Sequence, residues 1–246
     1  MNHLPLLLAA ALFGGALNAV AGGGSFLTLP ALVFTGMAPV AANATGTFAL
    51  LPGYLSSTWG FREDIRARQA IALPGMVLVS LAGGALGAAL LLLTPNGTFQ
   101  AMVPWLLLFA TALFAAGPYL LARLSRESPA GKFATLSGVL IVSIYGGYFN
   151  GGLGIMLLAL LGLLGHSDLN LMNGLKNLLS AVLTAIAVIL YAWGGAIVWP
   201  AALAMMLAAA IGGYAGARVA RRLPPQLVRW GIVAVGMVMS SLFFLH

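Results

Sequence analysis

Cysteine is absent from the 246-residue chain, and charged residues make up only 6% of it. The lack of cysteine excludes disulfide bonds and thiol chemistry. All four acidic residues and all three histidines fall in predicted loops or at the ends of the chain: Glu63, Asp64, Glu127, Asp168, His3, His166 and His246. Because no catalytic pair, triad or metal-ligand cluster falls within an apolar segment, we predict neither an enzyme nor a metal or cofactor site.

Apolar residues dominate instead, at 61% of the chain, and the mean hydropathy is +1.05. A soluble protein of this size could not cover such a core with polar surface. Apolar stretches near the roughly 20 residues that a bilayer requires recur at about 40–60, 70–93, 99–122, 170–191, 197–218 and 227–245. The sequence therefore predicts an all-α polytopic membrane protein, surrounded by lipid and without a soluble domain.

The net charge of +7 would suggest nucleic acid as a partner in a soluble protein. Here ten of the eleven cationic residues sit in short connections, at 62–68, 123–132 and 218–229. Basic residues in short loops set the orientation of a membrane protein, since such loops stay on the cytoplasmic side. We therefore expect these three connections in the cytoplasm, both termini outside it, and no nucleic-acid partner.

Two glycine-rich runs, at residues 22–25 and 151–154, interrupt apolar segments. Each run is followed by about ten further apolar residues, which end at Gly36 and Gly165. Ten helical residues cover about 15 Å, half of the hydrocarbon thickness, so neither short arm spans a bilayer alone. We predict two broken, re-entrant helical hairpins, at 4–35 and 133–164, with irregular tips buried inside the protein.

The two runs belong to an internal repeat. Gly22 and Gly151 lie 129 positions apart, and the glycine-rich stretch at 83–88 matches 212–217 at the same offset. We predict two repeats, 1–125 and 130–246, each made of a hairpin and three transmembrane helices. Three crossings per repeat invert the second copy, so the hairpins enter from opposite faces. The stretches at 83–88 and 212–217 are expected to be helix-packing faces.

Facing hairpin tips would bring two helix N-termini together near the midplane. Helix N-termini carry unpaired N–H groups and a positive dipole end, which makes an anion site without a side-chain charge. Glycine breaks in corresponding positions of inverted repeats point to such a site. The alternative is that the glycines only let the hairpins fold and pack.

The helix after each hairpin carries a polar pair at i, i+4 spacing, Asn43 with Thr47 and Asn173 with Asn177. Such pairs share one helix face and line either a pathway or a helix–helix contact. Lys176 is the only cation well inside an apolar segment. Its side chain either reaches back to the cytoplasmic surface or draws an anion inward. The predicted substrate-binding residues are Gly23, Gly24, Ser25, Asn43, Thr47, Gly151, Gly152, Asn173, Lys176 and Asn177.

The glycine runs at 22–26 and 151–154, the segment 41–45 and the pair Asn173-Gly174 together resemble the TauE/SafE family, also called the sulfite exporter or TSUP family. The resemblance covers nearly the whole chain. It implies a bacterial inner-membrane carrier for small sulfur-containing anions such as sulfite, sulfoacetate or other organosulfonates. It points to the two glycine breaks and the two Asn-bearing helix starts. Lys176 stands where the first repeat has Gly46, so a strictly symmetric site is not expected.

The sequence favours a secondary carrier that exports such an anion by alternating access, since no nucleotide motif is present to drive it. Two other functions remain open: an anion channel that uses the same hairpin tips, and a non-transporting membrane subunit. The exact substrate, the coupling ion, the direction and a homodimeric state are not fixed by the residues.

Overall fold

The computed structural model describes residues 3–67, 73–124, 131–166 and 168–220, with isolated residues between 230 and 244. All regular structure within these residues is helical, which confirms the predicted all-α class. The helices are α1 (Leu4–Ala21), α2 (Ser25–Phe34), α3 (Pro39–Gly60), α4 (Arg62–Ala67), α5 (Leu73–Leu93), α6 (Asn96–Leu124), α7 (Lys132–Tyr148), α8 (Leu153–Leu163), α9 (Leu169–Trp193) and α10 (Trp199–Ala220). The helix predicted at 227–245 lies largely outside the described residues.

Several helices have the length and composition of membrane spans. Among the described residues, Leu73–Leu93, Asn170–Trp193 and Trp199–Gly216 are both long and apolar enough to cross a bilayer. α3 is 22 residues long, but its hydropathy is lowered by polar residues such as Asn43, Thr45 and Thr47. These features support a multi-pass membrane protein.

The outer surface of the bundle is apolar. Large side chains such as Phe13, Leu93 and Phe133 are 63–86% exposed, which would be costly in water over so much of a surface. All five tryptophans are also exposed, between 46% and 88%: Trp59, Trp105, Trp193, Trp199 and Trp230. Exposed tryptophan is enriched where a protein meets the two membrane–water interfaces.

Both predicted glycine breaks interrupt helices. α1 ends at Gly22, whose φ of 76° is the left-handed conformation that glycine adopts most readily, and α2 begins three residues later. α7 ends at Phe149 in extended conformation, and α8 follows Gly152 with φ 74°. α2 and α8 have only 10 and 11 residues, so each covers about half of a bilayer.

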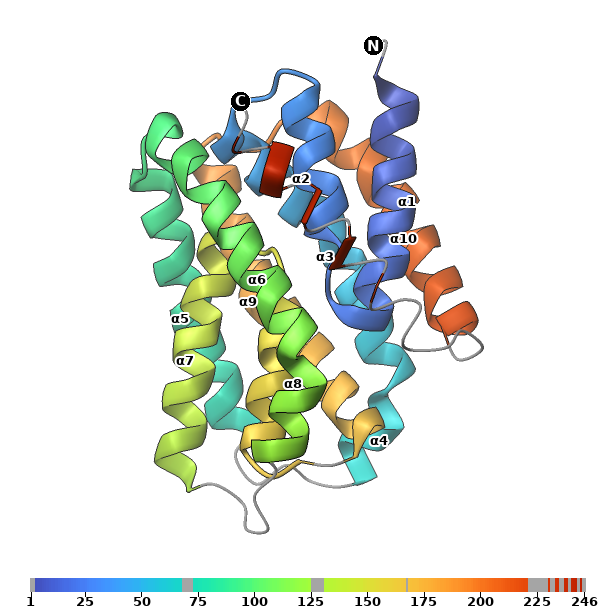
Figure 1. Ribbon diagram of the computed structural model, residues 1–246, viewed down its shortest axis with the longest axis vertical. Helices are drawn as coiled ribbons and strands as arrows, with labels where there is room; N and C mark the ends of the chain where they lie inside the picture. Colours follow the sequence, from blue (N-terminus) through green and yellow to red (C-terminus); the bar gives the residue numbers. More distant parts are fainter. Residues whose placement is uncertain are drawn as a thin grey trace.

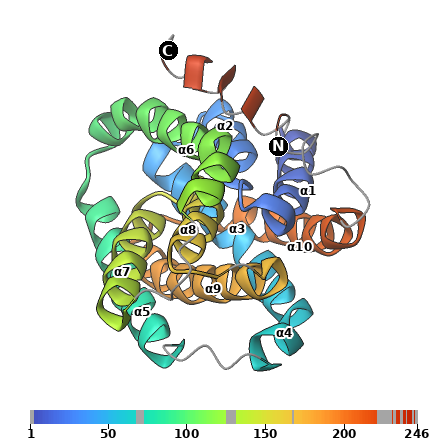
Figure 2. The ribbon, with the colours of Figure 1, turned by 60° about the horizontal axis from the view of Figure 1, so that its bottom comes forward.

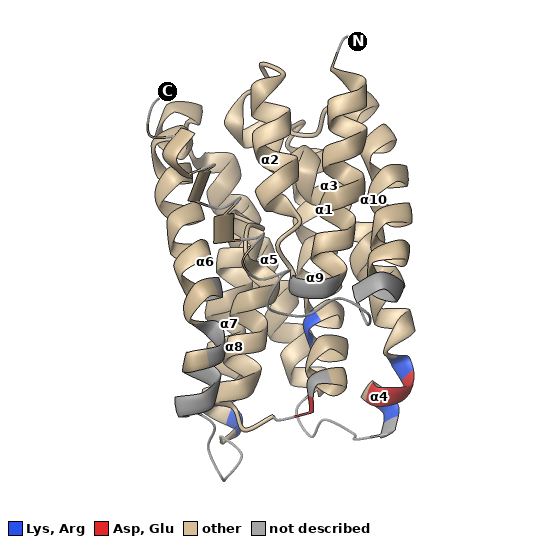
Figure 3. Cartoon of the chain, turned by 45° about the vertical axis from the view of Figure 1, so that its right-hand side comes forward, with Lys and Arg blue, Asp and Glu red and all other residues tan. Residues whose placement is uncertain are grey.

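The helices pair in a regular pattern. α1 packs along α10 and α7 along α5, while α3 packs on α10 and α9 on α5. α3 and α9 pack on each other, and α3 lies near the middle of the bundle in Figure 2. Most of the charged residues drawn in Figure 3 gather at the end of the bundle that carries α4. The start of α1 lies at the opposite end (Figure 1).

Glycine lets the paired helices approach closely, as the sequence predicted for the stretches at 83–88 and 212–217. A methyl group on Gly212 would overlap the carbonyl oxygen of Leu12 in α1. On the other side of the bundle, a methyl group on Gly83 would lie 2.6 Å from Cβ of Ser143 in α7. Both stretches are therefore helix-packing faces, in which backbone meets backbone or Cβ atoms.

Adjacent glycines in α10 provide a matched test of this packing. We expect Gly212→Ala to destabilise the protein by about 2 kcal/mol, since the added methyl overpacks the contact with α1. Gly213→Ala should be neutral or stabilising, because its methyl would lie 3.5 Å from the nearest atom, Cα of Gly53, and alanine favours helix. Thermal unfolding in detergent measures both. Equal melting temperatures for the two variants would contradict the packing assignment.

Candidate functional site

The two glycine breaks meet in the interior. A methyl group placed on Gly154 would lie 2.6 Å from Cα of Gly22, and one on Gly22 would overlap the backbone of Gly154. No side chain therefore separates the two hairpin tips at this point. From this contact α2 runs towards the end of the bundle where α1 begins, and α8 runs towards the end with α4 (Figures 1 and 3).

The N-termini of α2 and α8 lie at this contact without side-chain caps. Their N-cap residues are Gly24 and Gly152, and neither helix start donates a backbone N–H to a capping side chain. The carbonyls of Gly23 and Gly24 accept the N–H groups of Phe26 and Leu27, each at 3.1 Å, so backbone alone closes the first turn of α2. Two positive dipole ends are thus brought to one buried place.

Lys176 lies against the tips. Its Cδ would be 3.3 Å from a methyl group on Gly154, and the side chain is 0% exposed. Its Nζ makes no hydrogen bond within the described chain, where the one ion pair is between Arg62 and Glu63. Complete burial excludes the alternative that the side chain reaches back to the surface.

The position of Lys176 follows from the start of α9. The Asp168 carboxylate accepts the N–H groups of Asn170 and Leu171, at 2.9 and 3.3 Å, which fixes the first turn of the helix. Lys176 follows eight residues later, about 12 Å along the helix axis. The helix therefore carries the ammonium from the end of the bundle that holds α4 into its interior.

The inner face of α9 continues as a polar stripe. Asn177, Ser180 and Thr184 are 0% exposed and follow one another at i, i+3 and i+7. Both amide atoms of Asn177 and the hydroxyl oxygens of Ser180 and Thr184 lack hydrogen-bond partners in the described chain. Buried polar groups are rarely left unsatisfied, so such a stripe indicates a place for water or a ligand. Asn173 lies one turn earlier, half-buried, with its Oδ1 also unpartnered.

Two polar side chains of α3 make hydrogen bonds to other segments of the chain. Asn43 donates its amide N–H to the carbonyl of Tyr148 at 3.1 Å, and Thr45 accepts the N–H of Val198 at 3.1 Å. Thr47 is buried beside them at 2% exposure. Asn43 thus has a hydrogen-bond partner within the chain, whereas the polar stripe on α9 keeps its hydrogen-bonding capacity.

The second tip is held by tyrosines. Tyr145 donates to the carbonyl of Gly151 at 2.7 Å, and Tyr54 donates to Oδ1 of Asn150 at 3.0 Å. Asn150 Nδ2 has no partner in the described chain, nor has Oδ1 of Asn18, which also lies buried in α1.

Most of the predicted site residues are buried. Gly23, Gly24 and Ser25 at the first tip and Gly151 and Gly152 at the second are all buried. The predicted site did not include five further polar residues that the structure buries: Asn18, Tyr54, Asn150, Ser180 and Thr184. Ser180 and Thr184 carried a signal, since they continue the helical spacing of Asn173 and Asn177, and Asn150 directly precedes the second glycine run.

The chain is similar to known membrane proteins over nearly its whole length. The family model described as "Sulfite exporter TauE/SafE" matches residues 7–243. A "Probable membrane transporter protein" of Haemophilus influenzae is 29% identical, over 98% of this chain and 94% of its own. "Probable membrane transporter protein ORF9" of a Sinorhizobium species is 28% identical, over 96% and 90%. "Probable membrane transporter protein YfcA" of Escherichia coli is 28% identical, over 97% and 88%.

No solved structure matches the chain. The family match spans almost the entire sequence and includes both glycine breaks and the α9 stripe. The chain therefore belongs to the TauE/SafE family of membrane transporters.

Proposed function

We propose that this protein is a secondary transporter that moves small sulfur-containing anions, such as sulfite, sulfoacetate or other organosulfonates, out of a bacterial cell across the inner membrane. The observation that carries the proposal is the contact between the two uncapped hairpin tips beside the buried, unpaired ammonium of Lys176. Sulfite is named in the description of the matching family, and the organosulfonates follow from the resemblance that the sequence shows to that family. The two helix N-termini and the ammonium together create a positive electrostatic potential. They do so at a place where the backbone can approach an oxyanion closely.

The electrostatic potential of this site favours a negatively charged ligand. An ammonium without a partner inside a membrane protein is costly, and a bound oxyanion would compensate it. The free groups of Asn177 and Ser180 lie on the same helix face and would donate hydrogen bonds to further oxygens. An inside-negative membrane potential would assist export of a monoanion by about 2.3 kcal/mol per 100 mV.

An inverted repeat would supply the movement. The pairing of α1 with α10 is echoed by that of α7 with α5, and the pairing of α3 with α10 by that of α9 with α5. This echo supports two equivalent units, 1–125 and 130–246, whose hairpins enter from opposite faces. Rocking one unit against the other around the tips would expose a bound anion to each side in turn.

The competing function is an anion channel with the same tip site. The complete burial of Lys176 and Asn177 favours a carrier, since a closed site is expected of an occluded state. Purified protein in liposomes separates the two. If the protein is a carrier, unlabelled sulfite inside the liposomes should accelerate uptake of ³⁵S-sulfite by exchange. The rate of this uptake should saturate as the external sulfite concentration rises. Anion current without exchange would instead establish a channel.

Replacing Lys176 by methionine tests the anion site. Methionine keeps the length and removes the charge, so Lys176→Met should raise the melting temperature of the protein without substrate. The same variant should lose the thermal stabilisation by sulfite and reduce exchange by at least tenfold, since one charge-assisted hydrogen bond accounts for about 1.5–3 kcal/mol.

The control for this variant is Lys132→Met, at the exposed start of α7. It removes one cation outside the site and should leave sulfite stabilisation unchanged. Full stabilisation by sulfite in Lys176→Met would show that the ammonium does not bind the anion.

Gly154→Ala tests the contact between the tips. The added methyl would lie 2.6 Å from Gly22 Cα and 3.3 Å from Lys176 Cδ, so the tips must separate. We expect a folded protein with a sulfite dissociation constant raised at least fivefold, measured by isothermal calorimetry. Gly53→Ala is the matched control, since a methyl group there would meet no other atom within 4 Å. Equal sulfite affinities in the two variants would rule out a role for close tip contact.

A further inference from the structure

A groove separate from the hairpin tips lies between α3, α4 and α9. Its volume is about 510 Å³, and its lining includes Leu55 and Trp59 of α3, Arg62 and Arg66 of α4, and Val182 and Ala185 of α9. The lining is mostly apolar along α3 and α9, and both charged residues come from α4. The groove therefore has an apolar wall and a cationic end.

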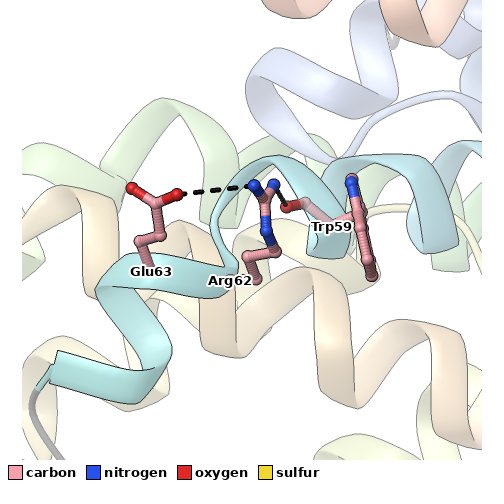
Figure 4. Close-up of polar contacts among 3 residues, drawn as sticks. All are labelled: Trp59, Arg62 and Glu63. Carbon is pink, nitrogen blue, oxygen red and sulfur yellow. Dashed lines mark hydrogen bonds and ion pairs between the residues drawn. The ribbon is translucent and has the colours of Figure 1, made fainter.

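The cationic end is built by α3 and α4 together. The Arg62 guanidinium lies 4.8 Å from the centre of the Trp59 ring, and its Nη1 donates to the Trp59 carbonyl at 3.0 Å (Figure 4). Trp59 itself is 69% exposed. A cation stacked on an exposed tryptophan is typical of the membrane–water interface, where an aromatic ring meets headgroups.

Packing holds α4 in this place. A methyl group on Gly174 in α9 would lie 2.8 Å from Cγ1 of Ile65, so the glycine lets α4 sit directly on α9. The arginines are therefore carried by a helix that is seated on the bundle. They lie at the end where most charged residues gather (Figure 3).

Arg62 and Arg66 both have N–H donors that can bind an anion. Arg66 is exposed and forms no ion pair or hydrogen bond within the described chain. Arg62 pairs with Glu63 at 3.4 Å (Figure 4), but the two side chains are 39% and 85% exposed, so solvent weakens this pair. A guanidinium has five N–H donors, which leaves Arg62 free to bind phosphate as well.

We propose that this groove binds an acidic phospholipid of the leaflet on the α4 side, with its phosphate at Arg62 and Arg66 and an acyl chain along Leu55 and Val182. A small soluble anion would leave the apolar wall uncovered, whereas the cationic headgroup of a zwitterionic lipid would oppose the attraction of its phosphate to the two guanidinium groups. Leu55 is 55% exposed, as expected for a side chain that meets lipid. Basic pockets between membrane helices bind acidic headgroups by the same chemistry. The site is independent of the proposed anion transport.

Native mass spectrometry of the purified full chain tests the proposal. Dioleoyl phosphatidylglycerol should bind at least tenfold more tightly than dioleoyl phosphatidylcholine, and the Arg62→Gln/Arg66→Gln double variant should lose this preference. Ala185→Phe fills the apolar part of the groove and should weaken binding of phosphatidylglycerol without altering any charge. Glycerol 3-phosphate, which has the headgroup chemistry but no acyl chain, should not compete.

Lys132→Gln is the control, because it removes a cation outside the groove. Its preference for phosphatidylglycerol should match that of the unaltered chain, and the melting temperature without lipid verifies that each variant is folded. Three results would overturn the proposal: an unchanged preference in the double arginine variant, an equal loss in Lys132→Gln, or full competition by glycerol 3-phosphate.

Discussion

The Lys176 ammonium is completely buried and has no ion-pair partner among the described residues, and the arrangement around it is best understood from this fact. Burial of a charge at the centre of a bilayer costs several kcal/mol unless the surroundings compensate. Around Lys176 the described chain supplies no carboxylate, but it supplies amide and hydroxyl groups of α9 that have no other partner. The described chain therefore compensates the charge of Lys176 only in part. A bound anion would lower the remaining cost of burying this charge.

Glycine makes this arrangement possible. The tips touch through the backbones of Gly22 and Gly154, and a side chain at either position would separate them. The same lack of side chains lets α10 lie against α1 and α5 against α7, so the helices that carry the hairpins are held close. The residue type that breaks α1 at Gly22 therefore also fixes where the two helix dipoles meet.

Much of this could be predicted from the sequence because the signals are local. The glycine runs at 22–25 and 151–154 predicted the helix breaks, which the structure places at 22–24 and 149–152, and the spaced glycines predicted the packing faces of α5 and α10. The polar pair of α9 indicated which face turns inward. The final helix, at 227–245, and the inversion of the repeats stay predictions.

Other features depend on contacts between residues far apart in the chain, so no local pattern revealed them. The bond from Tyr54 to Asn150 joins residues 96 positions apart. Asn43 donates to the carbonyl of Tyr148, which lies 105 positions along the chain. Asn177 has no such partner in the described chain. The sequence could not show whether Lys176 is buried or reaches the surface, since its long side chain allows both. The groove beside α4 likewise exists only once α4 is seated on Gly174.

We expect an oxyanion to bind where the hairpin tips meet Lys176. A crystal structure with selenite in place of sulfite would locate the anion, since selenium is marked by its anomalous scattering. An anomalous peak should lie within about 4 Å of Lys176 Nζ, between residues 22–25 and 152–154, at hydrogen-bonding range through the selenite oxygens. A peak elsewhere in the bundle, with the tips closed on each other and Lys176 unpaired, would contradict it.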